Sequence, residues 1–131
     1  MKLDGGAVVD KLNGNTFDPL NPSAGPALTP SERDGLVAQL ASEPASSDLR
    51  AQVLRSICEN GIFHRRQFSK AFVLMQYFGY LRREPNTNPD SDFSGYNFWL
   101  GKLNASNGNF IEAEMVKAFI SSSEYRGRFG R

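Results

Sequence analysis

The chain has 131 residues, of which 40% are apolar and 22% are charged, a composition typical of a single soluble globular domain. Fifteen Lys and Arg residues against fourteen Asp and Glu residues leave a net charge of +1, which argues against a general nucleic-acid binder. No stretch approaches the roughly 20 apolar residues of a membrane span. The only cysteine, Cys58, and the only histidine, His64, argue against a disulfide framework, a multi-cysteine metal site and the common His-based catalytic sites.

The first part of the chain is poor in core-forming side chains and rich in glycine, asparagine and proline. A short apolar piece over residues 7–12 favours one or two helical turns. Residues 17–28 contain three prolines, and each proline fixes its own φ and biases the preceding residue away from the α conformation. We therefore expect an N-terminal arm or linker over residues 1–28 and a helical domain over residues 29–131.

A clear helix start follows this arm. The segment Thr29-Pro30-Ser31-Glu32 has threonine at the N-cap, proline at the first helical position and glutamate three residues after the cap, which together predict a capping box. The helix that it begins is expected to end near Pro44. A second helix is expected from Ser46-Ser47 to Asn60-Gly61, where the Asn-Gly pair is typical of a helix end.

The longest helix is expected over residues 64–83. Its middle part, residues 71–81, is apolar on nearly every side, a pattern typical of a central helix that its neighbours cover on most faces. The chain holds fifteen aromatic residues, ten of them phenylalanine, and each can bury on the order of 150–250 Å². This long aromatic helix is therefore predicted to form the middle of the core.

The remaining sequence predicts two more helices and a short last turn. Prolines, asparagines and aspartates over residues 84–92 break the chain, and Ser94 is expected to cap a fourth helix. Asn107-Gly108 is the sharpest turn signal after that helix, and a fifth helix is expected over residues 110–120. A run of serines then predicts a cap and a short turn through Tyr125. No segment alternates with period two, so we predict an all-α bundle of five to six helices around the aromatic helix.

The turn that precedes the fourth helix resembles the first half of an EF-hand loop. Asp90, Asp92 and Ser94 place oxygen atoms at relative positions 1, 3 and 5, with Gly95 at position 6. The twelfth position, where calcium sites carry a bidentate glutamate, is Gly101. We therefore favour a structural interpretation, in which the aspartates form turns and Ser94 caps the helix, and calcium stays the alternative.

Basic residues gather at two places, around His64-Arg65-Arg66 and at Arg82-Arg83. Arginine pairs bind phosphates and acidic glycans, but the near-neutral total charge favours a solvated face held by ion pairs with nearby glutamates. A thiol catalyst would need Cys58 to have a low pKa and a partner base such as His64. We interpret Cys58 as a buried, inert residue, because no supporting motif accompanies the pair.

Aromatic side chains suggest one more possible site. Tyr77, Tyr80, Tyr96 and Trp99 have flat rings of the kind that stack on sugars, and the Arg82-Arg83 pair could add hydrogen bonds. Aromatic residues at helical spacing more often belong to a core than to a ligand platform. Apart from Tyr77, these residues are the speculative ligand-binding set, and no residue is assigned a catalytic role.

Three stretches of the sequence resemble the bacterial domain-of-unknown-function family 4214. They are an aromatic helix over residues 71–83 that leads into a Leu-Arg-Arg-x-Pro break over residues 81–85, a Gly-aromatic-Trp helix over residues 92–104, and a segment that ends Ser-x-Glu-Tyr-Arg over residues 113–126. The resemblance covers most of the chain and is strongest over residues 49–129. This family is in turn distantly similar to the helical linker domains of the phycobilisome.

The resemblance implies a non-catalytic module of a longer secreted or cell-surface bacterial protein. Its expected partners are other domains of the parent protein, or a surface protein or glycan, and self-association is a further expectation. No nucleic acid, membrane span, catalytic residue or cofactor is expected. The beginning of the sequence has no apolar run of the signal-peptide kind, which fits either a cytoplasmic protein or an excerpt of a longer secreted chain. The alternative function is a carbohydrate- or ligand-binding domain that uses an aromatic and arginine surface.

Overall fold

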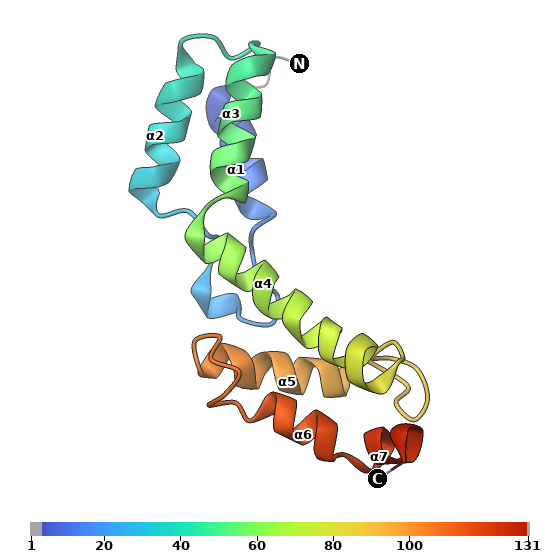
Figure 1. Cartoon of the computed structure of the whole chain (residues 1–131). Helices are drawn as coiled ribbons and strands as arrows, with labels where there is room; N and C mark the ends of the chain where they lie inside the picture. Colours follow the sequence, from blue (N-terminus) through green and yellow to red (C-terminus); the bar gives the residue numbers. More distant parts are fainter. Residues whose placement is uncertain (1–3, 131) are drawn as a thin grey trace. The chain divides into compact units, whose positions relative to one another are not determined.

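The computed structural model describes residues 4–130, which contain helices and turns but no strand (Figure 1). The predicted all-α class is therefore confirmed. Contacts divide the chain into two compact units, which we call unit 1, ending at Arg66, and unit 2, beginning at Gln67. The elements are α1 (Gly5–Gly14), the 3-10 turn η1 (Pro22–Ala24), α2 (Pro30–Ala41), α3 (Ser47–Cys58), α4 (Gly61–Gln76), the π-helical turn η2 (Tyr77–Leu81), α5 (Ser94–Ala105), α6 (Met115–Ser121) and α7 (Ser123–Phe129).

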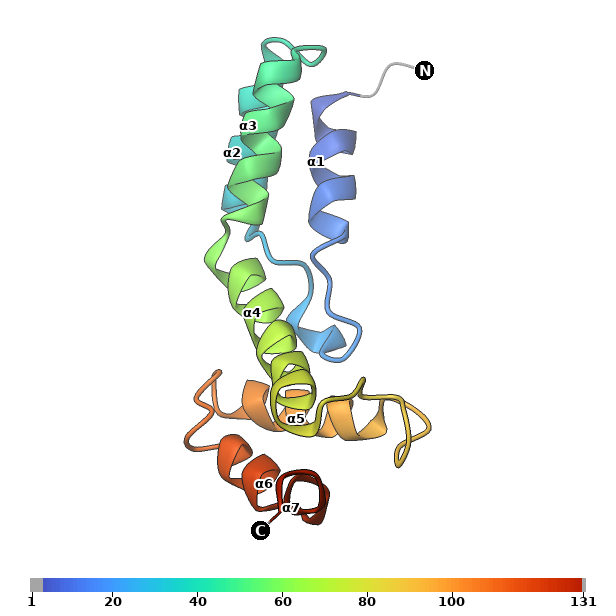
Figure 2. The ribbon, with the colours of Figure 1, turned by 45° about the vertical axis from the view of Figure 1, so that its right-hand side comes forward.

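Unit 1 is built on α1, α2 and α3, which lie side by side (Figure 2). Its core consists of Val9, Leu40, Val53 and Ile57, each buried and each on the inner face of its helix. Gly5 allows α1 to approach α2 closely, because a Cβ at this position would lie 2.9 Å from the Cβ of Leu40. The three helices therefore share one small apolar core.

The capping signals of unit 1 are confirmed. The Thr29 hydroxyl accepts a hydrogen bond from the Glu32 backbone N–H at 3.3 Å, and the Glu32 carboxylate accepts one from the Thr29 N–H at 2.8 Å. The Ser46 hydroxyl likewise accepts a hydrogen bond from the backbone N–H of Leu49 and caps α3. Such caps depend on residues only three positions apart, so local sequence is enough to predict them.

The predicted arm over residues 1–28 needs correction, because much of it belongs to unit 1. Val9 of α1 is fully buried. Farther on, the Asn13 side chain accepts a hydrogen bond from the Leu28 N–H at 3.0 Å, and the Thr16 hydroxyl accepts one from the Ala27 N–H at 2.7 Å. These buried polar side chains hold the proline-rich segment without a long apolar run. Residues 1–3 of the predicted arm lie outside the described residues.

Unit 2 is formed by the end of α4, η2, α5, α6 and α7. The rings of Tyr77 and Phe119 meet edge to face with centroids 5.1 Å apart, and Trp99 packs on the other side of Phe119 at 5.6 Å. The buried members of this core are Val73, Tyr77, Leu81, Leu100, Leu103, Ala113, Met115 and Phe119. The aromatic content of the chain is thus partly used as predicted, to fill a helical core.

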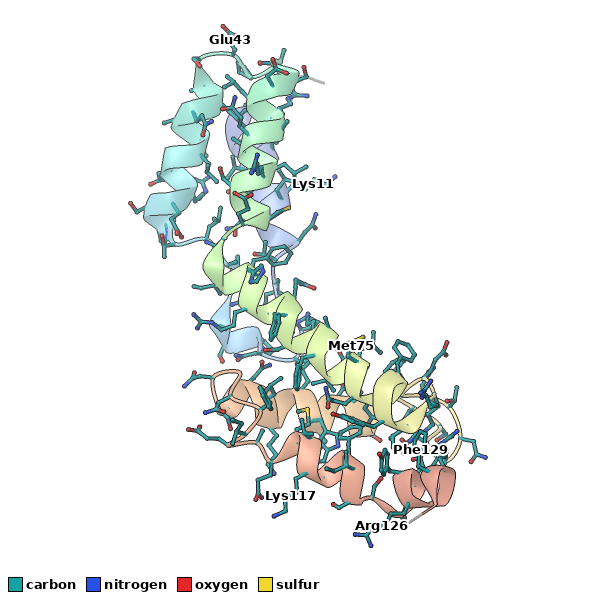
Figure 3. The ribbon with its side chains drawn as sticks, in the orientation of Figure 1. Lys11, Glu43, Met75, Lys117, Arg126 and Phe129 are labelled. Atoms are coloured by element: carbon teal, nitrogen blue, oxygen red, sulfur yellow. The ribbon has the colours of Figure 1, made fainter. Side chains whose placement is uncertain are left out.

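The long aromatic helix is not covered on most of its faces, and that prediction is wrong. α4 ends at Gln76, and its buried side chains in unit 2 are confined to one stripe that includes Ser69 and Val73. Phe68 is 58% exposed and Met75 is 60% exposed, and Met75 lies on the side of α4 away from α5 and α6 (Figure 3). Apolar residues on a helix predict burial only where another element is present to cover them.

The last part of the chain also differs from its prediction. The fifth helix, expected from residue 110, begins at Met115, because Glu114 adopts a left-handed conformation with φ of 51°. The preceding turn is held by Asn109, whose side chain accepts hydrogen bonds from the next N–H groups, and it leaves Ile111 73% exposed. The Asn107-Gly108 turn is confirmed, since both residues have positive φ.

The final helix is longer than the short turn that we expected. The Ser122 hydroxyl accepts a hydrogen bond from the Tyr125 N–H at 3.1 Å, so the predicted serine cap is confirmed. The helix then continues to Phe129, whose ring packs against that of Tyr125 at 4.8 Å. This contact between rings four residues apart explains why the glycine-containing tail stays helical.

Replacing Gln76 with methionine should raise the free energy of unfolding by about 1 kcal/mol. The Gln76 side chain is buried in unit 2, and its Oε1 has no hydrogen-bond partner, although its Nε2 donates to the Phe72 carbonyl. Methionine has a similar length and brings no polar atom to satisfy. Urea unfolding measures the change, and Gln67→Met, at an exposed position of the same helix, is the matched control. A clear loss of stability in Gln76→Met would contradict this view of the amide.

Candidate functional site

The end of α4 turns sharply and brings an arginine inside unit 2. The wide π-helical turn η2 buries Tyr77 and Leu81 together, and the next residue, Arg82, is left-handed with φ of 55°. The chain therefore changes direction here, and the Arg83 side chain is only 7% exposed. Turns of the π type are rare and occur frequently at functional sites, so the end of α4 is a candidate position for such a site.

Arg83 connects three segments of unit 2. Its Nε and Nη2 donate to the Glu124 carboxylate at 2.6 and 3.0 Å, and Nη2 also donates to Oδ2 of Asp90 at 2.8 Å. Its Nη1 donates to backbone carbonyls of the loop after η2, those of Glu84 and Thr87 among them. Every nitrogen of the guanidinium is thus engaged, and these bonds hold the pKa of Arg83 above its ordinary value.

A cavity of about 280 Å³ lies beside this ion-pair cluster, and all of its lining belongs to unit 2. Its lining combines aromatic and apolar side chains with the arginine and its two carboxylates, and the Arg83 guanidinium lies 5.3 Å from the centre of the Tyr77 ring. The lining residues that matter here are Tyr77, Arg83, Asp90, Gly95, Trp99, Phe119 and Glu124. The volume is near the lower end of the range for small-molecule sites, which suits a ligand of a single ring.

Gly95 allows the Tyr77 phenol to approach the start of α5 closely. A Cβ on Gly95 would lie 2.8 Å from the Tyr77 hydroxyl oxygen and 3.8 Å from Oδ2 of Asp90. Real Cβ atoms essentially never approach an oxygen so closely, so any other residue would displace the phenol. The absence of a side chain at Gly95 therefore makes room for the Tyr77 phenol beside the first turn of α5.

Stability should fall as the pH rises above about 10, and Tyr77 should account for part of the fall. Burial raises the pKa of the Tyr77 phenol above its ordinary value of 10.0, the nearby Asp90 carboxylate raises it further, and Arg83 opposes the shift. The folded chain then keeps a proton that the unfolded chain releases. Urea unfolding at about pH 8 and about pH 11 measures this loss. An equal loss in Tyr77→Phe would contradict the assignment.

The predicted ligand-binding residues do not come together in one place. Arg83 and Trp99 line the cavity, whereas Tyr80 packs edge to face on Tyr125. Tyr96 donates its hydroxyl to the Lys70 carbonyl at 3.1 Å. The Arg82 guanidinium lies 6.0 Å from the centre of the Phe129 ring, which α7 turns toward η2 (Figure 3). Trp99 itself is half-buried, with the Lys102 ammonium 5.4 Å from its ring centre.

The oxygen residues of the EF-hand-like turn have separate roles in the structure. Asp90 is bound to Arg83, whereas Asp92 accepts a hydrogen bond from the Ser94 N–H at 2.8 Å. Hydrogen bonds from Ser94 lower the pKa of Asp92. Ser94 does not cap α5 as predicted, because it is already the first helical residue and Phe93 stands at the N-cap. Within residues 4–130 no group of three or more metal-ligating side chains is gathered.

The other candidates are distributed over unit 1. Cys58 is exposed, which corrects the prediction of a buried thiol, because it lies at the end of α3 beyond the apolar stripe. Arg66 donates to the backbone carbonyls of Thr16 and Gly25, both at 2.9 Å, so it holds the proline-rich segment. Arg55 pairs with Glu59 at 2.9 Å on the surface, as the favoured interpretation of the basic residues expected.

Sequence reasoning missed two residues that shape the cavity. Glu124 lies 41 residues after Arg83, and nothing in its local sequence indicates that it is the main partner of that arginine. Gly95 was noted only as a turn glycine. From the sequence, Gly95 is recognisable only as a glycine near the start of a helix. Nothing in the neighbouring residues indicates that Tyr77 packs against it.

Comparison with family models, with curated proteins and with solved structures finds no match to this chain. The resemblance to family 4214 therefore stays a prediction. None of the helices in the described part of the chain combines the length and the apolar character needed to cross a membrane.

Proposed function

We propose that this chain is a non-catalytic interaction or scaffolding module of a secreted or cell-surface bacterial protein. One observation carries the proposal: unit 2 has a row of apolar side chains that are exposed, except for the half-buried Phe72, which joins the row to the core. The rings of Phe68 and Phe72 stack at 6.2 Å, and Phe72 contacts Phe110 at 5.1 Å. Ile111 follows Phe110 directly and is the most exposed of the large apolar residues described. We call these four residues the aromatic row.

The aromatic row supports a role in binding another surface. Single exposed apolar side chains are common on soluble proteins, but connected apolar patches mark interaction sites more often. Two members of the row, Phe68 and Ile111, are more than half exposed. The expected partners are another domain of the parent protein, or a surface protein or glycan, and the location at the cell surface follows from the resemblance.

The charged side chains that line the cavity support the non-catalytic part of the proposal. Arg83, Asp90 and Glu124 are bound to one another and to backbone groups, as members of a structural ion-pair cluster are. Their hydrogen bonds join the loop after η2 to the first turn of α7. Such a cluster stabilises a fold, and the hydroxyl of Ser122, which also lines the cavity, donates to the Phe119 carbonyl at 2.7 Å and not to a carboxylate.

The proposal is tested by capture from the surface fraction of the source cell. The chain is immobilised, and the retained proteins and glycans are compared between the native chain and Phe68→Ser/Ile111→Ser. The matched control is Leu54→Ser/Ile62→Ser, which removes two half-exposed apolar side chains from unit 1. Circular dichroism confirms that each variant is folded.

We expect one defined component to bind the native chain and the unit 1 variant and to be lost with Phe68→Ser/Ile111→Ser. Capture that survives in this variant would contradict a role for the aromatic row. Steady turnover of a substrate by the purified native chain would contradict the non-catalytic function itself.

A further inference from the structure

We propose that the aromatic row pairs with the same row of a second copy of this chain, with Ile111 of each copy seated in an apolar pocket of the other. This inference rests on the proposed interaction function and names the partner of the row. Three observations carry it: a pocket beside the row, the two charges that border this pocket, and the apolar area that the row exposes.

The pocket lies at the Ile111 end of the aromatic row. It has a volume of about 330 Å³, and it is lined by Phe110, Ile111, Glu114, Val116 and Lys117, which all belong to unit 2. Three of these residues are apolar, and Ile111 is 73% exposed although it is part of the lining. One copy therefore presents an exposed apolar side chain and an apolar hollow next to each other. Two copies related by a two-fold axis can each place Ile111 in the pocket of the other, because a two-fold interface uses the same surface on both copies.

The two charged residues of the pocket lining have opposite signs. Lys117 Nζ lies 3.9 Å from Glu114 Oε1 of the same copy, and the two side chains are 81% and 66% exposed. A pair this long and this exposed contributes little to the stability of one copy. In the symmetric pair, Glu114 of each copy meets Lys117 of the other, so two ion pairs form between the copies and fix their register.

The same charges favour a second copy over a polyanionic partner. An anionic lipid surface or a nucleic acid selects surfaces with an excess of Lys and Arg. The pocket lining carries one charge of each sign, and residues 110–117 as a whole hold two glutamates and one lysine. A second copy supplies both signs and an apolar centre between them, which is what this mixed surface needs.

The exposed area fits a weak dimer. Phe68, Phe110 and Ile111 are 58%, 41% and 73% exposed. With roughly 200 Å² for each of these side chains, the row exposes on the order of 350 Å² of apolar surface per copy. A two-fold interface covers this area twice, and together with the charged rim it approaches about 1,000 Å², the lower end of the range for specific interfaces. We therefore expect a dimer with a Kd on the order of tens of micromolar.

The test measures the molar mass of the purified chain by sedimentation equilibrium, from a few micromolar to about 1 mM. Ile111→Ser removes the apolar side chain that enters the pocket, and Ile120→Ser is the matched control, because Ile120 is 41% exposed on α6 and does not line the pocket. Two charge reversals, Glu114→Lys and Lys117→Glu, are measured separately and as an equimolar mixture. Circular dichroism confirms that each variant is folded.

We expect the native chain and Ile120→Ser to dimerise alike, and Ile111→Ser to weaken the dimer at least tenfold. Each charge reversal alone should weaken it by about tenfold, because two copies then oppose like charges. The mixture should restore it, because a copy with two lysines meets a copy with two glutamates. An ion pair that serves only its own copy would not be rescued by mixing.

The proposal is overturned if the native chain stays monomeric over this range, if Ile111→Ser dimerises as the native chain does, or if mixing the two reversals restores nothing. A monomeric chain that still captures a different component through the aromatic row would overturn this inference alone and leave the proposed function standing.

Discussion

Arg83→Met should lower the free energy of unfolding of the chain by about 3 kcal/mol or more. Methionine keeps much of the apolar length of the side chain but removes every hydrogen bond that the guanidinium makes. The Glu124 carboxylate then loses both of its short bonds, and three carbonyls of the loop after η2 lose a donor. Urea unfolding followed by Trp99 fluorescence measures the change.

Two further substitutions separate the geometry of the guanidinium from its charge. Arg83→Lys should recover only a minor part of the loss, because an ammonium cannot donate in the forked arrangement that Glu124 and Asp90 accept. Arg82→Met is the control, since Arg82 is exposed and its guanidinium lies over the Phe129 ring, outside the ion-pair cluster. If Arg83→Met costs no more than Arg82→Met, the ion-pair cluster does not hold unit 2 together.

Leu100→Ala should cost about 3 kcal/mol, within the usual range of about 2–5 kcal/mol for such a change in a core. Leu100 of α5 is 1% exposed and belongs to the cluster that joins α5 to η2 and α6. The truncation removes apolar contacts and leaves a void that the surrounding helices fill only in part. Urea unfolding followed by Trp99 fluorescence again gives the change in the free energy of unfolding.

The matched control for this change lies two positions earlier on the same helix. Phe98 is 62% exposed, so Phe98→Ala removes a larger side chain but should cost less than about 1 kcal/mol. A cost for Phe98→Ala equal to that for Leu100→Ala would mean that the two faces of α5 are buried alike, contrary to the structure.

The sequence was sufficient to predict those features of the structure that depend on residues three or four positions apart. The caps at Thr29, Ser46 and Ser122 and the turn at Asn107-Gly108 were all predicted, because each is decided by a side chain and the nearest backbone groups. The all-α class followed from the same local patterns, repeated along the chain.

Features that depend on distant residues could not be predicted. Asn13 and Thr16 hold residues more than ten positions away, which turned an expected arm into part of unit 1. The exposure of Phe68 and Met75 depends on where other helices lie, and no local pattern reports this. The candidate cavity depends on the same kind of information, since Arg83 meets Glu124 only in the folded chain.

Hydrogen–deuterium exchange of the chain, alone and with its captured partner, tests the proposed interaction function most directly. The function predicts slower exchange on binding in peptides that cover residues 68–72 and 110–111, where the aromatic row lies. Peptides of α2 should exchange as before, because the row includes no residue of unit 1. Protection confined to unit 1, with unchanged exchange in the two row peptides, would contradict the account.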